Sequence, residues 1–204
     1  MKITMDQEYC YTSNVEPPLV VHDTQTINWD DSADLVIVGF GGAGAASALQ
    51  ARERGADVIA IDRFSGGGAT AKSGGVIYAG GTRFQKEAGF DDTADEMYRY
   101  LLFEGTPVRE DTLRRFCQQS AENIEWLTGH GVEFGSTVYS ERIAYPPDGY
   151  YLYYTGMEKF RSDIAKPSPR GHRTLGKGPT GGNYFAPLKA SALRNGVRFH
   201  PHTP

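Results

Sequence analysis

Cysteine is scarce in this chain of 204 residues, which contains only Cys10 and Cys117. Two cysteines so far apart in sequence exclude a disulfide framework and a Cys-x-x-Cys redox pair. Cys117 falls on the apolar side of an expected helix, so we predict that it packs in a core.

Long apolar runs are missing too. No run approaches the roughly 20 residues that a membrane-spanning helix needs. The N-terminus has no signal-peptide pattern of charged, apolar and small-residue regions. We therefore expect no membrane span and a cytoplasmic location.

The chain also has no excess of basic residues, with 21 Lys and Arg against 25 Asp and Glu and a net charge of −4. This balance leaves no electrostatic footprint for nucleic acid, so no nucleic-acid partner is expected. No Gly-x-Ser-x-Gly elbow supports a hydrolase. His200 and His202 alternate on an expected strand, but no carboxylate or cysteine accompanies them, and we predict no metal site.

The most informative stretch is residues 34–44, where a short apolar run leads into a Gly-x-Gly-x-x-Gly turn. The run is typical of a buried parallel strand covered on both faces. Gly39 permits the tight turn, and Gly41 lets the backbone approach a pyrophosphate. Gly44 lets the next helix pack closely on the sheet. The pattern predicts a dinucleotide-binding βα unit.

The context after the turn agrees with this interpretation. Residues 42–54 form a small-residue helix whose N-terminus would face the phosphates, and Gly55 stands at its expected end. A second apolar run, residues 58–61, ends in Asp62, where a carboxylate would accept hydrogen bonds from ribose hydroxyls. Arg63 is able to accommodate a 2′-phosphate, but Asp62 would repel one, so FAD or NAD is favoured over a 2′-phosphorylated nucleotide. The alternative is a surface Asp without a ligand.

Residues 65–82 are rich in glycine, serine and threonine. Such a segment exposes backbone N–H groups and small hydroxyls, as a loop along a pyrophosphate and a flavin does. The chain here resembles the fumarate reductase and 3-oxosteroid dehydrogenase group of FAD-dependent oxidoreductases. The resemblance rests on Gly67-Gly68-Ala69-Thr70 followed by Ser73-Gly74-Gly75. Residues 29–34, residues 74–78 and Pro169-Arg170-Gly171-His172 look most like the ketosteroid Δ4-dehydrogenase branch.

The resemblance implies an α/β fold with an FAD-linked Rossmann-type parallel sheet and the start of an inserted α+β cap domain. It implies a reaction in which a substrate C–H is lost as a hydride to the flavin while a protein base removes the neighbouring proton. We leave the catalytic residues unassigned, since the group's base and proton donor lie mainly beyond Pro204. The predicted FAD-binding residues are Gly39, Gly41, Gly42, Ala43, Gly44, Asp62, Arg63, Gly67, Gly68, Ala69, Thr70, Ser73, Gly74 and Gly75.

The same resemblance implies more parallel strands than this chain holds, so we expect an N-terminal fragment, inactive and marginally stable by itself. We predict an arm over residues 1–30, an FAD-binding part over 31–132, a loop-rich cap region over 133–182, and a helix and strand over 183–204. The expected function is a 3-ketosteroid dehydrogenase acting on CH–CH groups. A fumarate or urocanate reductase and a non-catalytic FAD-binding remnant are the alternatives.

The remaining segments are expected to form helices and loops that support the fold. Thr93 and Glu96 form an expected capping box for a helix ending near Gly105, and a second amphipathic helix ends at Gly129. Residues 19–21 are expected to add an edge strand or to dock on the main domain. Residues 145–154 are dense in tyrosine, which suits either a wall for a flat apolar substrate or ordinary packing of long loops. Residues 169–173 are expected to present positive charge either to a carboxylate or the flavin, or to solvent.

Overall fold

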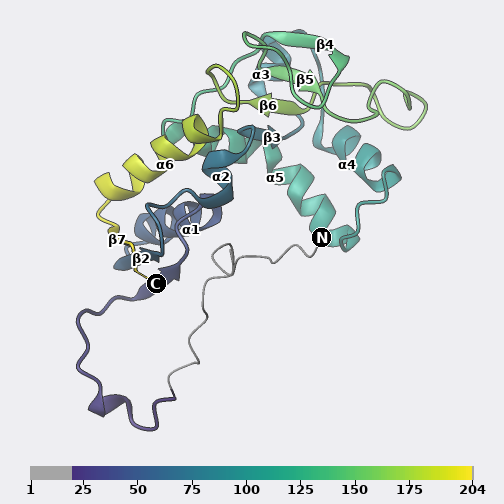
Figure 1. Cartoon of the computed structure of the whole chain (residues 1–204). Helices are drawn as coiled ribbons and strands as arrows, with labels where there is room; N and C mark the ends of the chain where they lie inside the picture. The colour runs from purple at the N-terminus through teal and green to yellow at the C-terminus, as the bar shows by residue number, and fades with distance from the viewer. Residues whose placement is uncertain (1–19, 204) are drawn as a thin grey trace, which may run out of the picture. The chain divides into compact units, whose positions relative to one another are not determined.

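The computed structural model describes residues 20–203, and the chain divides into two compact units, Met1–Ser32 and Ala33–Pro204 (Figure 1). In the first unit, the short 3-10 helix η2 spans Thr24–Thr26, and the Asp23 carboxylate accepts a hydrogen bond from the Gln25 N–H. Val20 and Val21 are not in a strand. The rest of the expected edge strand and Cys10 lie outside the described residues.

The second unit is built on a parallel sheet with the strand order β1-β2-β7. Its strands are β1 (Leu35–Val38), β2 (Val58–Asp62) and β7 (Arg198–Pro201). The helix α1 (Gly42–Glu53) connects β1 to β2, and β1 pairs with β2 from Leu35↔Val58 to Val38↔Ile61. The predicted βαβ unit and α/β fold are confirmed.

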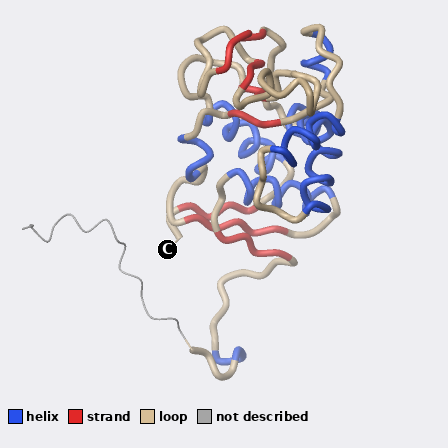
Figure 2. Tube along the Cα trace, turned by 90° about the vertical axis from the view of Figure 1, so that its right-hand side faces the viewer, coloured by secondary structure: helices blue, strands red, loops and turns tan. Residues whose placement is uncertain are grey.

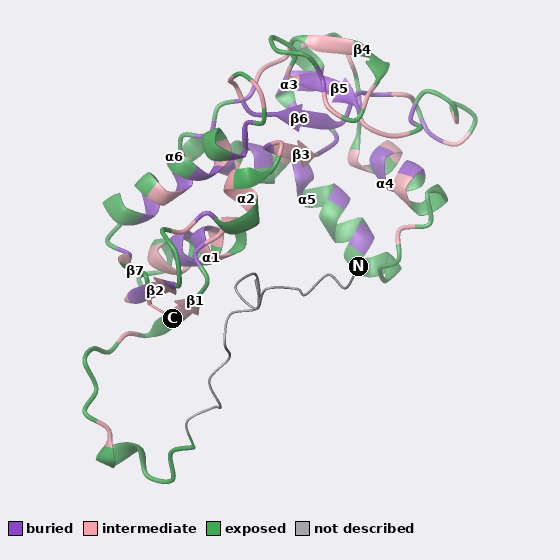
Figure 3. Cartoon of the chain, in the orientation of Figure 1, coloured by how far each residue is buried: buried purple, intermediate pink, exposed green. Residues whose placement is uncertain are grey.

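One face of β1 departs from the prediction. We expected both faces to be covered, but the Val36 and Val38 side chains are 53% and 81% exposed. Side chains alternate along a strand, so these two valines share one face, whereas Ile37 on the other face packs on the core below α1. Figure 3 shows the resulting contrast between the outer strand and the buried interior. The apolar run therefore predicted the strand correctly, but it did not predict that one face of the strand is exposed.

A second sheet of four strands, ordered β3-β6-β5-β4, lies beyond the helices (Figure 2). The strands are β3 (Val76–Tyr78), β4 (Val138–Arg142), β5 (Leu152–Tyr154) and β6 (Gly171–Arg173). Antiparallel pairing of β3 with β6 joins the glycine-rich segment to the region predicted as the cap entry. Both belong to the same compact unit, and the predicted domain boundaries stay predictions.

Five further helices complete the unit, and Gly181–Arg194 confirms the predicted C-terminal helix. They are α2 (Gly68–Lys72), α3 (Arg83–Glu87), α4 (Ala94–Phe103), α5 (Glu110–Gly129) and α6 (Gly181–Arg194). As predicted, the Cys117 side chain is buried, in a cluster between α4 and α5. Within residues 20–203, no helix is both long and apolar enough to cross a membrane.

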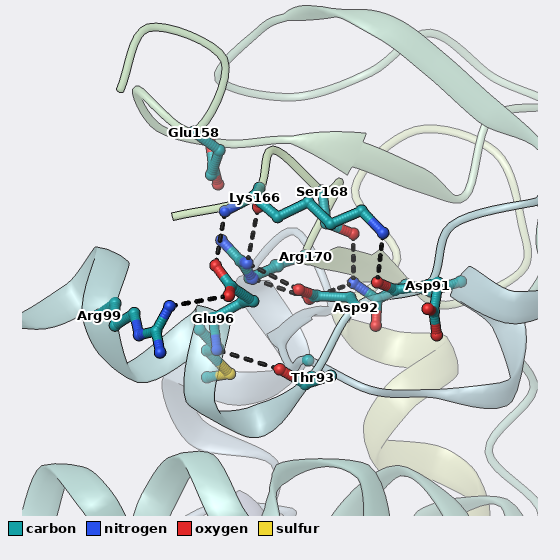
Figure 4. A network of polar contacts seen from close by, with 12 residues as sticks. Asp91, Asp92, Thr93, Glu96, Arg99, Glu158, Lys166, Ser168 and Arg170 are labelled. Atoms are coloured by element: carbon teal, nitrogen blue, oxygen red, sulfur yellow. Dashed lines mark hydrogen bonds and ion pairs between the residues drawn. The ribbon is translucent and has the colours of Figure 1, made fainter. Parts of the chain in front are cut away.

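The predicted capping box of α4 is only half correct. The Thr93 hydroxyl accepts the Glu96 N–H at 3.1 Å, as expected. The Glu96 carboxylate does not reach back, because it accepts hydrogen bonds from the Lys166 backbone N–H at 2.6 Å and from the Arg99 guanidinium (Figure 4). A donor distant in sequence therefore replaces the local partner. The reciprocal box occurs instead in α3, between Thr82 and Gln85.

A buried ion pair lies beneath the second sheet (Figure 4). Arg170 donates two hydrogen bonds to the Asp92 carboxylate, at 2.7 and 2.8 Å, and neither side chain is exposed. The Gln85 amide donates to the same carboxylate and to the Ser168 hydroxyl. Of the sequence alternatives for residues 169–173, contact with a carboxylate holds at Arg170, and the carboxylate is that of Asp92 within the protein.

His172 is also fully buried, on β6. Its Nδ1 lies 2.9 Å from the Arg170 carbonyl oxygen, which only accepts, so Nδ1 carries the proton. Nε2 then accepts from the Thr82 hydroxyl at 2.7 Å. Burial lowers the pKa of His172 from 6.5 to about 4, so the ring is neutral at neutral pH.

Replacing Asp92 by Asn should lower the free energy of unfolding by about 3–5 kcal/mol, because the Arg170 charge stays buried without its counter-ion. Asp163→Asn is the matched control, since Asp163 pairs with Arg161 on an exposed surface. Urea unfolding of both variants measures the difference. Equal stability of the two variants would contradict the assignment of Asp92 as the partner of a buried charge.

The stability of the chain should fall as the pH drops from 6.5 to about 4, because the unfolded state protonates His172 before the folded state does. The contribution of this residue is about 3 kcal/mol, from 1.36 kcal/mol per pKa unit. His172→Gln should flatten the pH dependence of the unfolding midpoint. His22→Gln, which removes an exposed histidine from the first unit, is the control variant.

Candidate functional site

The turn between β1 and α1 has the backbone that the glycine motif predicted. Gly39 has a φ of 94°, which favours glycine, and its N–H donates to the Ile61 carbonyl oxygen at 2.8 Å. A Cβ on Gly44 would lie 2.1 Å from the Gly39 carbonyl oxygen, so the helix approaches the strand as closely as backbone allows. A Cβ on Gly41 would meet only the Gly67 carbonyl group, at 3.7 Å or more. Open space in front of Gly41 fits a pyrophosphate beside the backbone.

The N-terminus of α1 faces this space. The first intrahelical hydrogen bond runs from the Ala45 N–H to the Gly41 carbonyl, so the N–H groups before Ala45 have no partner within the helix. The Gly42 N–H donates to the Thr70 hydroxyl at 3.1 Å, which ties α1 to α2. The remaining donors of the first turn, with the positive end of the helix dipole, suit a phosphate group.

Asp62 ends β2 as predicted, but its carboxylate is already engaged. One oxygen accepts the Phe40 N–H at 2.7 Å, and the other accepts the Phe64 N–H at 2.8 Å. These bonds hold the turn after β1 against the turn after β2. Each carboxylate oxygen keeps a second lone pair for another donor. Ribose binding by Asp62 stays a prediction, as does any role of Arg63, which is exposed and lies 5.2 Å from the Phe64 ring.

Parts of the glycine-rich segment form a helix and a strand. Residues 68–72 form α2, and residues 76–78 form β3. Gly67 precedes α2 with a φ of 94°, and its N–H donates to the Phe40 carbonyl oxygen at 2.7 Å. The segment therefore follows the turn after β1 before it enters the second sheet.

A pocket of about 410 Å³ lies between these elements, and the side chains in its walls are uncharged and mostly small. Its lining residues are Gly42, Ala43, Ala69, Thr70, Ser73, Gly75, Val76, Ile77 and Tyr184. The pocket thus brings together six of the predicted cofactor residues, from α1, α2 and the segment before β3. Backbone N–H groups and hydroxyls make up its polar chemistry, which suits a flavin ring or its linker.

Three lining residues are absent from the predicted set. Val76 and Ile77 directly follow the predicted Ser73-Gly74-Gly75 stretch. The pocket-lining segment therefore extends two residues beyond the predicted set. Tyr184 comes from α6, more than 100 residues away in sequence, and no local pattern pointed to it. It reaches the pocket because α6 packs on α2, where a Cβ on Gly181 would lie 2.3 Å from the Thr70 carbonyl oxygen. Burial raises the pKa of Tyr184, so its phenol is neutral.

The tyrosine-rich loop favours the packing alternative over a substrate wall. Tyr153 and Tyr154 are buried on β5, and burial raises the pKa of Tyr153 to about 12. Tyr145 turns its hydroxyl onto the Gly74 carbonyl oxygen at 2.9 Å. Tyr151 lies beside the buried guanidinium of Arg173. These tyrosines therefore contact other parts of the protein and do not form an open surface for a substrate.

The two histidines that we placed on one strand do not share it. β7 ends at Pro201, and His202 follows with a φ of 56°. Its N–H donates to the Phe64 carbonyl oxygen at 3.2 Å instead of continuing the strand. Their predicted common face is wrong because the backbone turns after Pro201.

Comparison with known proteins identifies the domain. Residues 34–204 match the family described as FAD binding domain, so the chain belongs to that family. The predicted family of FAD-dependent oxidoreductases and the cofactor FAD are thereby confirmed.

Three of the proteins that resemble the chain illustrate the similarity. The 3-oxo-5-alpha-steroid 4-dehydrogenase of Comamonas testosteroni is 42% identical over 186 residues, which cover 88% of this chain and 35% of that protein. The solved 3-ketosteroid Δ4-(5α)-dehydrogenase of Rhodococcus jostii is 37% identical, with a TM-score of 0.82 over 88% of this chain and 39% of that one. The NADH:fumarate oxidoreductase of Klebsiella pneumoniae is 38% identical over 50% of this chain and 11% of that protein. The chain thus spans less than two-fifths of each.

Replacing Gly41 by Val should weaken FAD binding at least about 100-fold, or about 2.8 kcal/mol, because the side chain fills the space before α1. The fold should survive, since the backbone at Gly41 is extended, with φ −89° and ψ −160°. Flavin titration followed by fluorescence measures the dissociation constant. Gly129→Ala, in open space at the end of α5, is the control. Unchanged FAD affinity of the Gly41 variant would remove the turn from the binding site.

Proposed function

We propose that this chain forms the N-terminal, FAD-binding part of an oxidoreductase that acts on a CH–CH group of a 3-ketosteroid. One observation carries the substrate class. Similarity to the Comamonas steroid dehydrogenase extends over 186 residues, whereas similarity to the fumarate oxidoreductase covers 103. The longer match includes more sequence beyond the nucleotide-binding unit, which ends at Asp62, and substrate differences are expected to lie in that sequence.

Different residues of the chain would bind different parts of FAD. The first turn of α1 and the open face of Gly41 would hold the pyrophosphate, and Asp62 would accept from the ribose. Ser73, Gly75 and Tyr184 would surround the flavin end of the pocket. When bound, FAD supplies the acceptor for a hydride.

The uncharged pocket limits what the chain itself contributes. Its lining offers no group that is charged at neutral pH, so its share is binding, orientation and exclusion of water. We assign no base or proton donor to the described residues. A cytoplasmic location stays a prediction from the sequence.

The alternative is an alkene reductase of the fumarate type, favoured by the 38% identity to the Klebsiella protein. A non-catalytic FAD-binding remnant is a further alternative. Both alternatives share the cofactor site with the first proposal; the reductase differs from it in the substrate, and the remnant differs in having no catalytic activity.

We expect the whole protein to oxidise a 3-ketosteroid in the presence of an artificial electron acceptor. The measurement is steroid-dependent dye reduction, with product identified by mass. The Gly41→Val protein serves as the control that lacks cofactor. Turnover of fumarate or urocanate with reduced flavin, without steroid oxidation, would move the function to the alkene reductases. No turnover despite bound FAD would favour the remnant.

A further inference from the structure

The carbonyl oxygens of Ser73, Gly74 and Gly75 all accept hydrogen bonds within the protein, and the first and third of these residues line the pocket. The Ser73 carbonyl oxygen accepts the Gly181 N–H at 3.0 Å, and the Gly75 carbonyl oxygen accepts the Thr174 N–H at 3.0 Å. The Gly74 carbonyl oxygen between them accepts two hydroxyls, from Tyr145 and Thr180, both at 2.9 Å. This central carbonyl is the one held entirely by side chains.

Anchoring the carbonyls fixes the direction of the N–H groups. In a trans peptide the C=O and the following N–H point in opposite directions, so the N–H groups of Gly74 and Gly75 face away from the anchors. The Gly75 N–H accordingly points to the hydroxyl oxygen of Ser73, at 3.2 Å, and both residues line the pocket. The Ser73 N–H is bonded as well, to the Thr70 carbonyl oxygen at 3.2 Å, so hydrogen bonds on both edges fix the backbone of this stretch in the pocket wall.

The Tyr145 ring contributes by contact as well as through its hydroxyl. A Cβ on Gly74 would lie 2.6 Å from a carbon of that ring, so the phenol covers Gly74 directly. The hydroxyl also lies 2.8 Å from the Gly178 carbonyl oxygen. Tyr145 therefore bridges the 73–75 stretch and the loop that leads into α6.

Arg173 holds Tyr145 in this place. Its fully buried guanidinium lies 4.8 Å from the Tyr145 ring and donates to the Asp148 carboxylate at 2.8 Å. It also donates to the Pro147 carbonyl oxygen at 3.0 Å and to the Gly178 carbonyl oxygen at 2.8 Å. One buried cation thus gathers the loop that carries Tyr145 and the loop that precedes α6.

We propose that Tyr145, held by Arg173, is a positioning residue that fixes the backbone of residues 73–75 in the wall of the cofactor pocket. The inference rests on the proposed cofactor-binding role of these residues and deepens it. The tyrosine-rich loop would then support cofactor binding indirectly, through residues of the pocket wall that Tyr145 contacts.

Tyr145→Phe tests the proposal in the full chain, because it keeps the ring over Gly74 and removes the hydroxyl. We expect the dissociation constant for FAD to rise about tenfold. In flavin-free protein we expect faster amide hydrogen exchange at Gly75 and Gly181, with unchanged exchange in β2. A purely structural tyrosine would lower the unfolding midpoint without these local changes.

Tyr153→Phe is the matched control, since it removes the hydroxyl of a buried phenol whose bond, to the Ala144 carbonyl oxygen, is a long 3.5 Å. We expect it to leave the FAD affinity unchanged. If the wild-type chain binds FAD and Tyr145→Phe binds it equally well, the positioning role is overturned. The same holds if both variants weaken binding alike. In either case the proposed cofactor-binding residues are not affected. If the wild-type chain binds no FAD, the proposed cofactor-binding residues fall as well.

Discussion

Close contact between backbones is the constraint on which this structure depends. α1 lies against the end of β1 only because residue 44 has no side chain, and α6 meets α2 only because residue 181 has none. Any side chain at either position would collide with a carbonyl oxygen. The two contacts bring the N-terminal ends of α1 and α2 and the start of α6 around one pocket. The site is therefore a consequence of helix packing.

Buried charges then hold the region behind the pocket. Arg170 and Arg173 leave β6 and its flanking turn with fully buried guanidinium groups, one paired with Asp92 and the other with Asp148. Each gathers segments that lie far apart in sequence, since buried donors must find acceptors wherever the fold provides them. The pocket itself stays uncharged. The charged groups therefore lie in the elements behind the pocket, whereas the pocket lining is neutral.

Several contacts were mispredicted, left open or missed because the decisive partner was distant in sequence. Glu96 suited a local capping box, but the Lys166 N–H captured its carboxylate. The tyrosine-rich loop was compatible with a substrate wall or with packing, and the Gly74 and Gly178 carbonyl oxygens drew Tyr145 inward. Tyr184 had no local signal because it approaches the pocket through the packing of α6 on α2. A short sequence window cannot contain such contacts.

The sequence by itself determined the βαβ unit, since strand, glycine turn, helix and acidic strand end depend on local backbone geometry and apolar periodicity. It also determined the FAD-binding family, through glycine spacings that a nucleotide requires. Only the tertiary structure decided which predicted residues share the pocket, that Asp62 braces two turns, and that Arg170 and Arg173 are buried. The physical reason is that burial and hydrogen-bond pairing arise between segments, after the chain has brought them together.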